Sequence, residues 1–119
     1  MSDPSLEKLM RANLLEVFGE RDADRRAEAI RRTYTQDVVF ADAEGQVEGH
    51  EALDAKVREI LDGAPGFVFR PDGDFYQVQD LGYLAWALGP EGAPPVVRGT
   101  DMGFVRDGLL AKVYTVLFR

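Results

Sequence analysis

The chain has 119 residues and a formal net charge of -7, from 21 acidic against 14 basic side chains. This balance argues against nucleic-acid binding, because contacts to phosphates need clustered Lys and Arg. There is no cysteine, which excludes disulfides, thiolate nucleophiles and thiolate zinc sites. No apolar run approaches the roughly 18 residues that span a membrane, and the N-terminus lacks the apolar core of a signal peptide. We therefore expect one globular domain over residues 1–119, in the cytoplasm, without nucleic-acid or membrane partners.

The first third of the chain is predicted to be helical. Asp3 followed by Pro4 is typical of a helix start, and apolar residues at helical spacing then predict an amphipathic helix to about residue 19. A second helix is predicted over residues 24–34. Arginines gather around this second helix and alternate with acids, which predicts a solvated face rich in ion pairs. These arginines are Arg21, Arg25, Arg26, Arg31 and Arg32.

The middle of the chain combines a short strand with a third helix. Residues 38–42 form an apolar run that ends on Asp42, which predicts a strand, and Glu44-Gly45 predicts a turn after it. A third helix follows, with inward apolar residues between positions 53 and 61, and it ends at the Gly-Ala-Pro-Gly sequence of residues 63–66.

The second half of the chain is predicted to be β-structure. Strands are expected over residues 67–70, 75–79, 83–88, 96–106 and 109–118, separated by turns rich in Gly, Pro and Asp. Helices followed by an antiparallel meander are typical of the α+β class. The late strands are apolar on both faces, whereas a sheet with one face in water alternates apolar and polar residues. The helices can cover only one face, so we expect the outer face to form an isologous homodimer.

Several short segments within this order carry a family resemblance. They are Asp37-x4-Asp42-x2-Gly45, Gly49-x2-Ala52-Leu53, the strand around Trp86, and Gly99-Thr100-Asp101 followed by Asp107-Gly108. With them, the chain resembles the nuclear transport factor 2-like superfamily, and within it the SnoaL-like branch. The resemblance implies a cone, in which a curved, mostly antiparallel sheet packs on three N-terminal helices around a pocket. It implies no single function, because the superfamily includes isomerases, polyketide cyclases, dehydratases and proteins without chemistry.

The resemblance extends to ketosteroid isomerase and suggests which acid would act. The general-base Asp of that enzyme lies in a similar Asp-x4-Asp-x2-Gly segment and matches Asp42. The Tyr of its first helix corresponds here to Leu14, and its protonated second Asp falls nearest Thr100 or Asp101. SnoaL-type polyketide cyclases use a pocket Asp, often aided by His. The one His of this chain, His50, starts the third helix, where we expect it to be solvated.

Asp42 is the first candidate for catalysis, as a general base. In an apolar cavity its carboxylate would be desolvated and could move protons near neutral pH. The alternative is structural, since an acid at the end of a strand also caps backbone amides, here those of residues 44 or 45. The sequence leaves both interpretations open.

Asp101 is the second candidate, either as a polar group of the pocket or as an ion-pair partner of Arg98 or Arg106. Strand alternation places Asp101 on the face of the small residues Gly99 and Gly103, opposite the larger Thr100, Met102 and Phe104. If the pocket lies on the face of the larger residues, Asp101 points away from it. We therefore favour the ion pair.

Ligand contacts are predicted for Tyr34, Trp86, Thr100 and Met102, with Tyr34 as the pocket hydroxyl. A single His and carboxylates without ligand spacing do not form a metal site, so neither a metal nor a cofactor is expected.

The leading hypothesis is binding of a small apolar molecule in the cone, with cofactor-free isomerase or cyclase chemistry. Asp42 would abstract a proton next to a carbonyl, and Tyr34, Thr100 or Asp101 would stabilise the enolate. The alternatives are a non-catalytic ligand-binding module that uses the same cavity, and a dimerisation module whose cone is filled by side chains. The sequence leaves open whether the protein is an enzyme.

Overall fold

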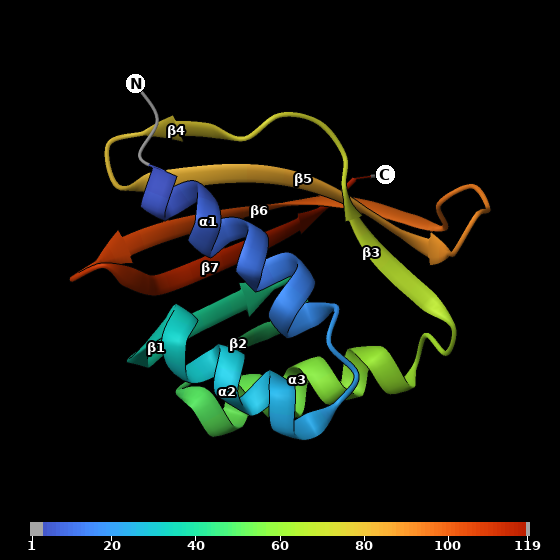
Figure 1. The fold of residues 1–119 in the computed structure, drawn as a ribbon, viewed down its shortest axis with the longest axis horizontal. Helices are drawn as coiled ribbons and strands as arrows, with labels where there is room; N and C mark the ends of the chain where they lie inside the picture. Colours follow the sequence, from blue (N-terminus) through green and yellow to red (C-terminus); the bar gives the residue numbers. More distant parts are fainter. Residues whose placement is uncertain (1–3, 119) are drawn as a thin grey trace.

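In the computed structural model, which describes residues 4–118, the helices lie on one face of a curved sheet (Figure 1). The helical segments are α1 (Pro4–Ala12), η1 (Asn13–Phe18), α2 (Ala23–Thr33) and α3 (His50–Asp62). The strands are β1 (Tyr34–Asp42), β2 (Gly45–Glu48), β3 (Phe67–Pro71), β4 (Tyr76–Val78), β5 (Leu81–Pro90), β6 (Val97–Arg106) and β7 (Leu109–Leu117). This arrangement confirms the predicted α+β class.

The strands follow the order β2-β1-β7-β6-β5-β3, and β4 also pairs with β5. Strands β1 and β7 are parallel, and the other pairs are antiparallel, which confirms the mostly antiparallel sheet. The parallel contact brings β1, which follows α2, beside the C-terminal strand β7. Strand β2 was not predicted; it forms a hairpin with β1, so the predicted turn at Glu44-Gly45 joins two strands.

The first helix continues from α1 into η1, where the backbone is π-helical. The predicted helix to about residue 19 is therefore present, although its second half has a wider turn. That half buries Asn13, Leu14, Val17 and Phe18 against the sheet and the other helices. A π-helical turn is rare and is often found at functional sites. The predicted capping residue Asp3 lies outside the described residues.

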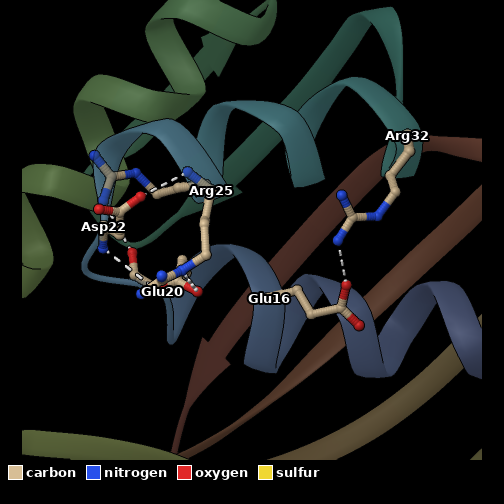
Figure 2. A network of polar contacts seen from close by, with 6 residues as sticks. Glu16, Glu20, Asp22, Arg25 and Arg32 are labelled. Carbon is tan, nitrogen blue, oxygen red and sulfur yellow. Dashed lines mark hydrogen bonds and ion pairs between the residues drawn. The ribbon is translucent and has the colours of Figure 1, made fainter.

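Helix α2 is capped at its start by Asp22, whose side chain accepts a hydrogen bond from the backbone N–H of Arg25. Figure 2 shows the surrounding polar contacts, in which Arg25 binds Glu20 and Arg32 binds Glu16 of η1. These contacts fit the predicted solvated face, since both arginines are exposed. Such exposed pairs are worth at most about 1 kcal/mol each.

Arg26 departs from that prediction, because its side chain is only 3% exposed. It forms an ion pair with Asp54 of α3 at 2.6 Å and donates to the backbone carbonyl of Glu20 at 2.9 Å. The reason is the contact between α2 and α3, which the sequence pattern of α2 alone does not contain. Arg26 thus joins two helices instead of facing water.

His50 also departs from its prediction, because it is half-buried. Its Nε2 lies 2.9 Å from the backbone carbonyl of Thr35 and 3.2 Å from that of Tyr34. Two carbonyl partners require this nitrogen to carry the proton and donate. His50 therefore fixes the start of α3 to the start of β1.

Strand β6 turns its small residues toward the helices. A Cβ atom at Gly99 would lie 2.6 Å from the carbonyl oxygen of Val116 and 2.8 Å from the ring of Trp86. A Cβ atom at Gly103 would collide with the sulfur of Met10. The predicted alternation of β6 is therefore present, but the core lies on the face of the small residues, because α1 and Trp86 approach β6 closely.

The opposite face of the sheet is the one that the helices leave uncovered. Exposed apolar side chains on its strands include Tyr76, Tyr114 and Val116, each at least 40% exposed. Ring pairs join Tyr76 to Tyr83 and Phe104 to Tyr114 across neighbouring strands. Within residues 4–118, no helix is both long enough and apolar enough to cross a membrane.

Candidate functional site

A cavity of about 270 Å³ opens between the helices and the inner face of the sheet. Its aliphatic lining consists of Leu14, Ala43, Ile60, Leu88, Val97 and Leu117. Its aromatic lining consists of Phe18, Phe40, Phe69 and Trp86. The polar residues that reach the cavity are few, and the acids among them are the two predicted candidates together with Glu44. The cone is therefore open. The alternative in which side chains fill the cone does not agree with the structure.

Asp101 lines this cavity and is 5% exposed. Its Oδ1 accepts hydrogen bonds from the indole Nε1–H of Trp86 at 3.0 Å and from the hydroxyl of Thr115 at 2.7 Å. Its Oδ2 accepts from the amide Nδ2–H of Asn13 at 2.9 Å. The favoured sequence interpretation, an ion pair with Arg98 or Arg106, is wrong, because Arg98 binds Asp72 and Arg106 binds Asp37.

Burial raises the pKa of Asp101 to about 6. The hydrogen bonds from Thr115, Trp86 and Asn13 lower the pKa, but the effect of burial is larger. Desolvation acts in this direction because water stabilises the charged form of a carboxyl group. A carboxyl group with this pKa can both accept and release a proton near neutral pH.

Tyr34 and Asn13 continue the hydrogen-bond chain away from the cavity. The hydroxyl of Tyr34, which is 1% exposed, donates to Oδ1 of Asn13 at 2.5 Å. Burial, together with the negative charge of Asp101, raises the pKa of Tyr34 well above its ordinary value. Tyr34 therefore stays protonated and holds the amide of Asn13 so that its Nδ2–H faces Asp101. The predicted pocket hydroxyl thus acts through Asn13 and does not line the cavity.

Asp42 also lines the cavity, in a different setting. Its Oδ2 lies 3.1 Å from Nζ of Lys56, and its Oδ1 accepts from the backbone N–H of Glu44 at 2.9 Å. Lys56 also binds Glu44, and this contact, together with those to Asp42, raises the pKa of the Lys56 ammonium. Asp42 therefore caps the turn, as the structural interpretation predicted, and also reaches the cavity, while its role as a general base stays a prediction.

Comparison with known proteins gives the family. The model of the SnoaL-like domain family matches residues 12–113, which is most of the chain. This chain belongs to the SnoaL-like domain family. No curated protein sequence matches it significantly.

Solved structures show the same fold at low sequence identity. A candidate isomerase of the SnoaL-like family from Agrobacterium tumefaciens is 19% identical, with a TM-score of 0.90, and the match covers 98% of this chain and 100% of that chain. A candidate SnoaL-like polyketide cyclase from Jannaschia sp. CCS1 is 14% identical, with a TM-score of 0.79 and coverage of 98% and 90%. A candidate ketosteroid isomerase from Kribbella flavida is 14% identical, with a TM-score of 0.73 and coverage of 97% and 78%. At these identities the likeness concerns the fold.

The other predicted contacts of this SnoaL-like domain divide between the two faces of the sheet. Trp86 lines the cavity and donates to Asp101. Thr100 and Met102 lie on the opposite face of β6 and do not line the cavity, so their predicted place in the cone is wrong. Thr100 is nevertheless only 3% exposed.

Four polar residues of the site were missed from the sequence: Asn13, Thr115, Lys56 and Glu44, the last of which was predicted only as part of a turn. Asn13 lies at helical spacing from Met10 and Val17 on the apolar stripe of the first helix, and a polar residue on such a stripe is a usable signal. Thr115 lies between Val113 and Leu117 on the same apolar face of its strand, and a polar residue there is a similar signal. Lys56 carries no such signal, since a Lys near the middle of a helix is common.

Proposed function

We propose that this SnoaL-like protein binds a small, largely apolar molecule in its cavity and exchanges a proton with it through Asp101. The observation that carries this proposal is a buried carboxyl group with a pKa of about 6 on an otherwise apolar wall. Enzymes that move protons at neutral pH use groups with pKa values in this range. We assign the proton transfer to Asp101 in preference to Asp42, because the carboxylate of Asp42 already has an ammonium partner.

The hydrogen bonds of Asp101 leave one oxygen less occupied than the other. Oδ1 accepts two hydrogen bonds and Oδ2 accepts one, whereas each carboxylate oxygen has room for about two. The carboxylate therefore keeps the capacity to accept a further interaction from a reacting C–H or O–H group of a bound molecule. The donors Asn13, Trp86 and Thr115 come from η1, β5 and β7, and they fix the orientation of the carboxylate before the ligand arrives.

The expected reaction class is a proton shift next to a carbonyl or a similar activating group. Asp101 would take the proton from one carbon atom, and the protonated carboxyl would return it to another atom of the same molecule. This sequence needs no cofactor, since no electrons leave the substrate. The cavity volume of about 270 Å³ is just below the usual range of pockets for drug-sized ligands, which starts at about 300 Å³. We therefore expect a ligand with one or two rings.

Deuterium exchange tests the assignment of Asp101. The protein is incubated with cyclohexenone in heavy water, and loss of the proton signals next to the carbonyl is followed by NMR. We expect faster exchange than in buffer, loss of this acceleration in Asp101→Asn, and retention in Asp37→Asn. Asp37 is a matched control because its carboxylate binds Thr35 and Arg106 at the surface. Equal exchange in Asp101→Asn and the wild type would rule out Asp101 as the base, and loss of the acceleration in Asp42→Asn alone would make Asp42 the base instead.

A second candidate function is ligand binding without catalysis. The observation that favours it is that both carboxylates already have partners in the protein, three hydrogen-bond donors for Asp101 and Lys56 for Asp42. In that case cyclohexenone or a larger cyclic ketone would shift the single tryptophan resonance of Trp86, and no exchange above the buffer rate would follow. Exchange above the buffer rate would show that the protein catalyses proton exchange.

A further inference from the structure

The cavity contains a negative charge that lacks a positive partner. Asp101 is 5% exposed, and its three hydrogen-bond donors are a neutral amide, a neutral indole and a neutral hydroxyl. Across residues 4–118, no Lys, Arg or His forms an ion pair with it. Buried acids are usually paired with a cation, because an isolated buried charge is costly.

The buried cations of the molecule are committed to other acids. Lys56, whose side chain is 11% exposed and which also lines the cavity, binds both Asp42 and Glu44. Arg26, whose side chain is 3% exposed, binds Asp54 between two helices. Among residues 4–118, neither of these buried cations is therefore available to balance a negative charge on Asp101, whereas a cationic ligand would supply that balance.

The walls beside Asp101 suit a positive charge. Phe40, Phe18, Phe69 and Trp86 form a continuous series of rings, with successive centroid distances of 5.1, 6.4 and 5.3 Å. All four rings line the cavity. Aromatic rings attract cations through their quadrupole, and groups of such rings recognise alkylammonium ligands in other proteins.

The other charged side chains that line the cavity also sum to a negative charge. Asp42 and Glu44 contribute two negative charges and Lys56 one positive charge, which leaves a net charge of -1 there. The whole chain has a net charge of -7. A site with a net negative charge attracts cationic ligands and repels anionic ones.

We propose that the ligand of this cavity is a small organic cation, with an ammonium or iminium nitrogen on an apolar frame that pairs with Asp101. This inference rests on the proposed function, since it takes the cavity to be the ligand site. It also fits proton transfer, because a proton that passes from such a ligand to Asp101 converts an ion pair into two neutral groups. Apolar surroundings favour that change.

Three probes of similar size and different charge test the proposal. Phenethylammonium, phenethyl alcohol and phenylacetate each combine a phenyl ring with a short chain, and their binding at neutral pH is measured by calorimetry. We expect phenethylammonium to bind about tenfold more tightly than the alcohol, and phenylacetate to bind most weakly. If the alcohol or phenylacetate binds as tightly as the cation, the proposal is wrong while the cavity remains a ligand site. If none of the three binds, both this proposal and the proposed function are wrong.

A charge-removing variant assigns the preference to Asp101. In Asp101→Asn, the cation and the alcohol should bind within about twofold of each other, whereas Asp37→Asn should keep the wild-type ratio. A preserved cation preference in folded Asp101→Asn would overturn the pairing with Asp101. Because the comparison of the three probes uses the unmodified protein, it decides the ligand class even if Asp101→Asn fails to fold.

Discussion

Asp101 and Asp42 are carboxylates of the same cavity, and their different surroundings give them different chemistry. Asp101 is buried among neutral donors, and burial raises its pKa to about 6. Asp42 has an ammonium group at 3.1 Å and a backbone N–H at 2.9 Å. Environment, and not residue type, therefore separates a group that exchanges protons near neutrality from a group held in an ion pair.

Among the hydrogen bonds to Asp101, the one from the hydroxyl of Thr115 lowers its pKa most. Thr115→Val keeps the shape of the side chain and removes this donor, so the pKa of Asp101 should rise further above its ordinary value. Carbon-NMR titration of the Asp101 carboxyl measures the change. Thr35→Val is the matched control, because the hydroxyl of Thr35 binds Asp37 at the surface. An unchanged or lower pKa in Thr115→Val would show that this hydroxyl does not stabilise the charged form.

At the level of single residues, the sequence predicted part of the site. It named Asp42, Asp101 and Trp86 as candidate site residues, although for Asp101 it favoured an ion pair outside the pocket. Strand alternation correctly placed Asp101 on the face of Gly99 and Gly103. It then assigned the cavity to the other face, because large side chains usually mark the inside. Contacts between residues far apart in the chain decided otherwise, such as the hydrogen bond from Asn13 to Asp101 across 88 positions. A local pattern does not contain such contacts.

Among the elements, β6 depends most on residue size. Gly99 faces the carbonyl of Val116 and the ring of Trp86 at distances that leave no room for a methyl group. Gly99→Ala should therefore cost about 1 to 3 kcal/mol of unfolding free energy and move Trp86. Urea unfolding measures the cost, and the tryptophan fluorescence of the native state reports the movement.

A glycine with room for a methyl group provides the control for that variant. At Gly63 a Cβ atom would keep ordinary contacts of at least 3.5 Å to helix carbonyls, so Gly63→Ala should change stability by less than about 0.5 kcal/mol. If Gly99→Ala were as stable as Gly63→Ala, the close approach of Trp86 to β6 would not constrain the fold.

Most elements follow from local sequence, and the exceptions have physical reasons. Apolar spacing and Gly- or Pro-rich turns gave the strands from β3 to β7 within a few residues of their observed bounds. Strand β2 escaped prediction because its four residues are mostly exposed and polar, so they carry no apolar alternation. The π-helical segment η1 escaped because its apolar spacing resembles that of an α-helix.

For the whole molecule, the uncovered face of the sheet carries the remaining prediction. We propose that this face forms an isologous homodimer, because Tyr114, Val116 and Phe118 leave 40 to 48% of their surface exposed there. Light scattering should give twice the 13.2-kDa chain mass. Val116→Asp should shift the protein toward the monomer, since it places like charges in the interface.

Leu15→Asp is the control for the dimer, because Leu15 is similarly exposed, at 43%, but lies on η1 at the helical side of the molecule. It should keep the dimer mass. A wild-type protein that is monomeric at working concentrations would contradict the dimer. Equal dissociation by both variants would contradict the choice of face.

The central claim is that a buried, proton-exchanging carboxyl group lines the cavity, and the single tryptophan of the chain reports on it directly. The indole Nε1–H of Trp86 donates to Asp101 at 3.0 Å, so its NMR signal should move when Asp101 gains a proton. We predict a titration of this signal with a midpoint near pH 6, and its loss in Asp101→Asn. A midpoint near the ordinary aspartate pKa of about 4, or a signal that does not titrate, would contradict the account.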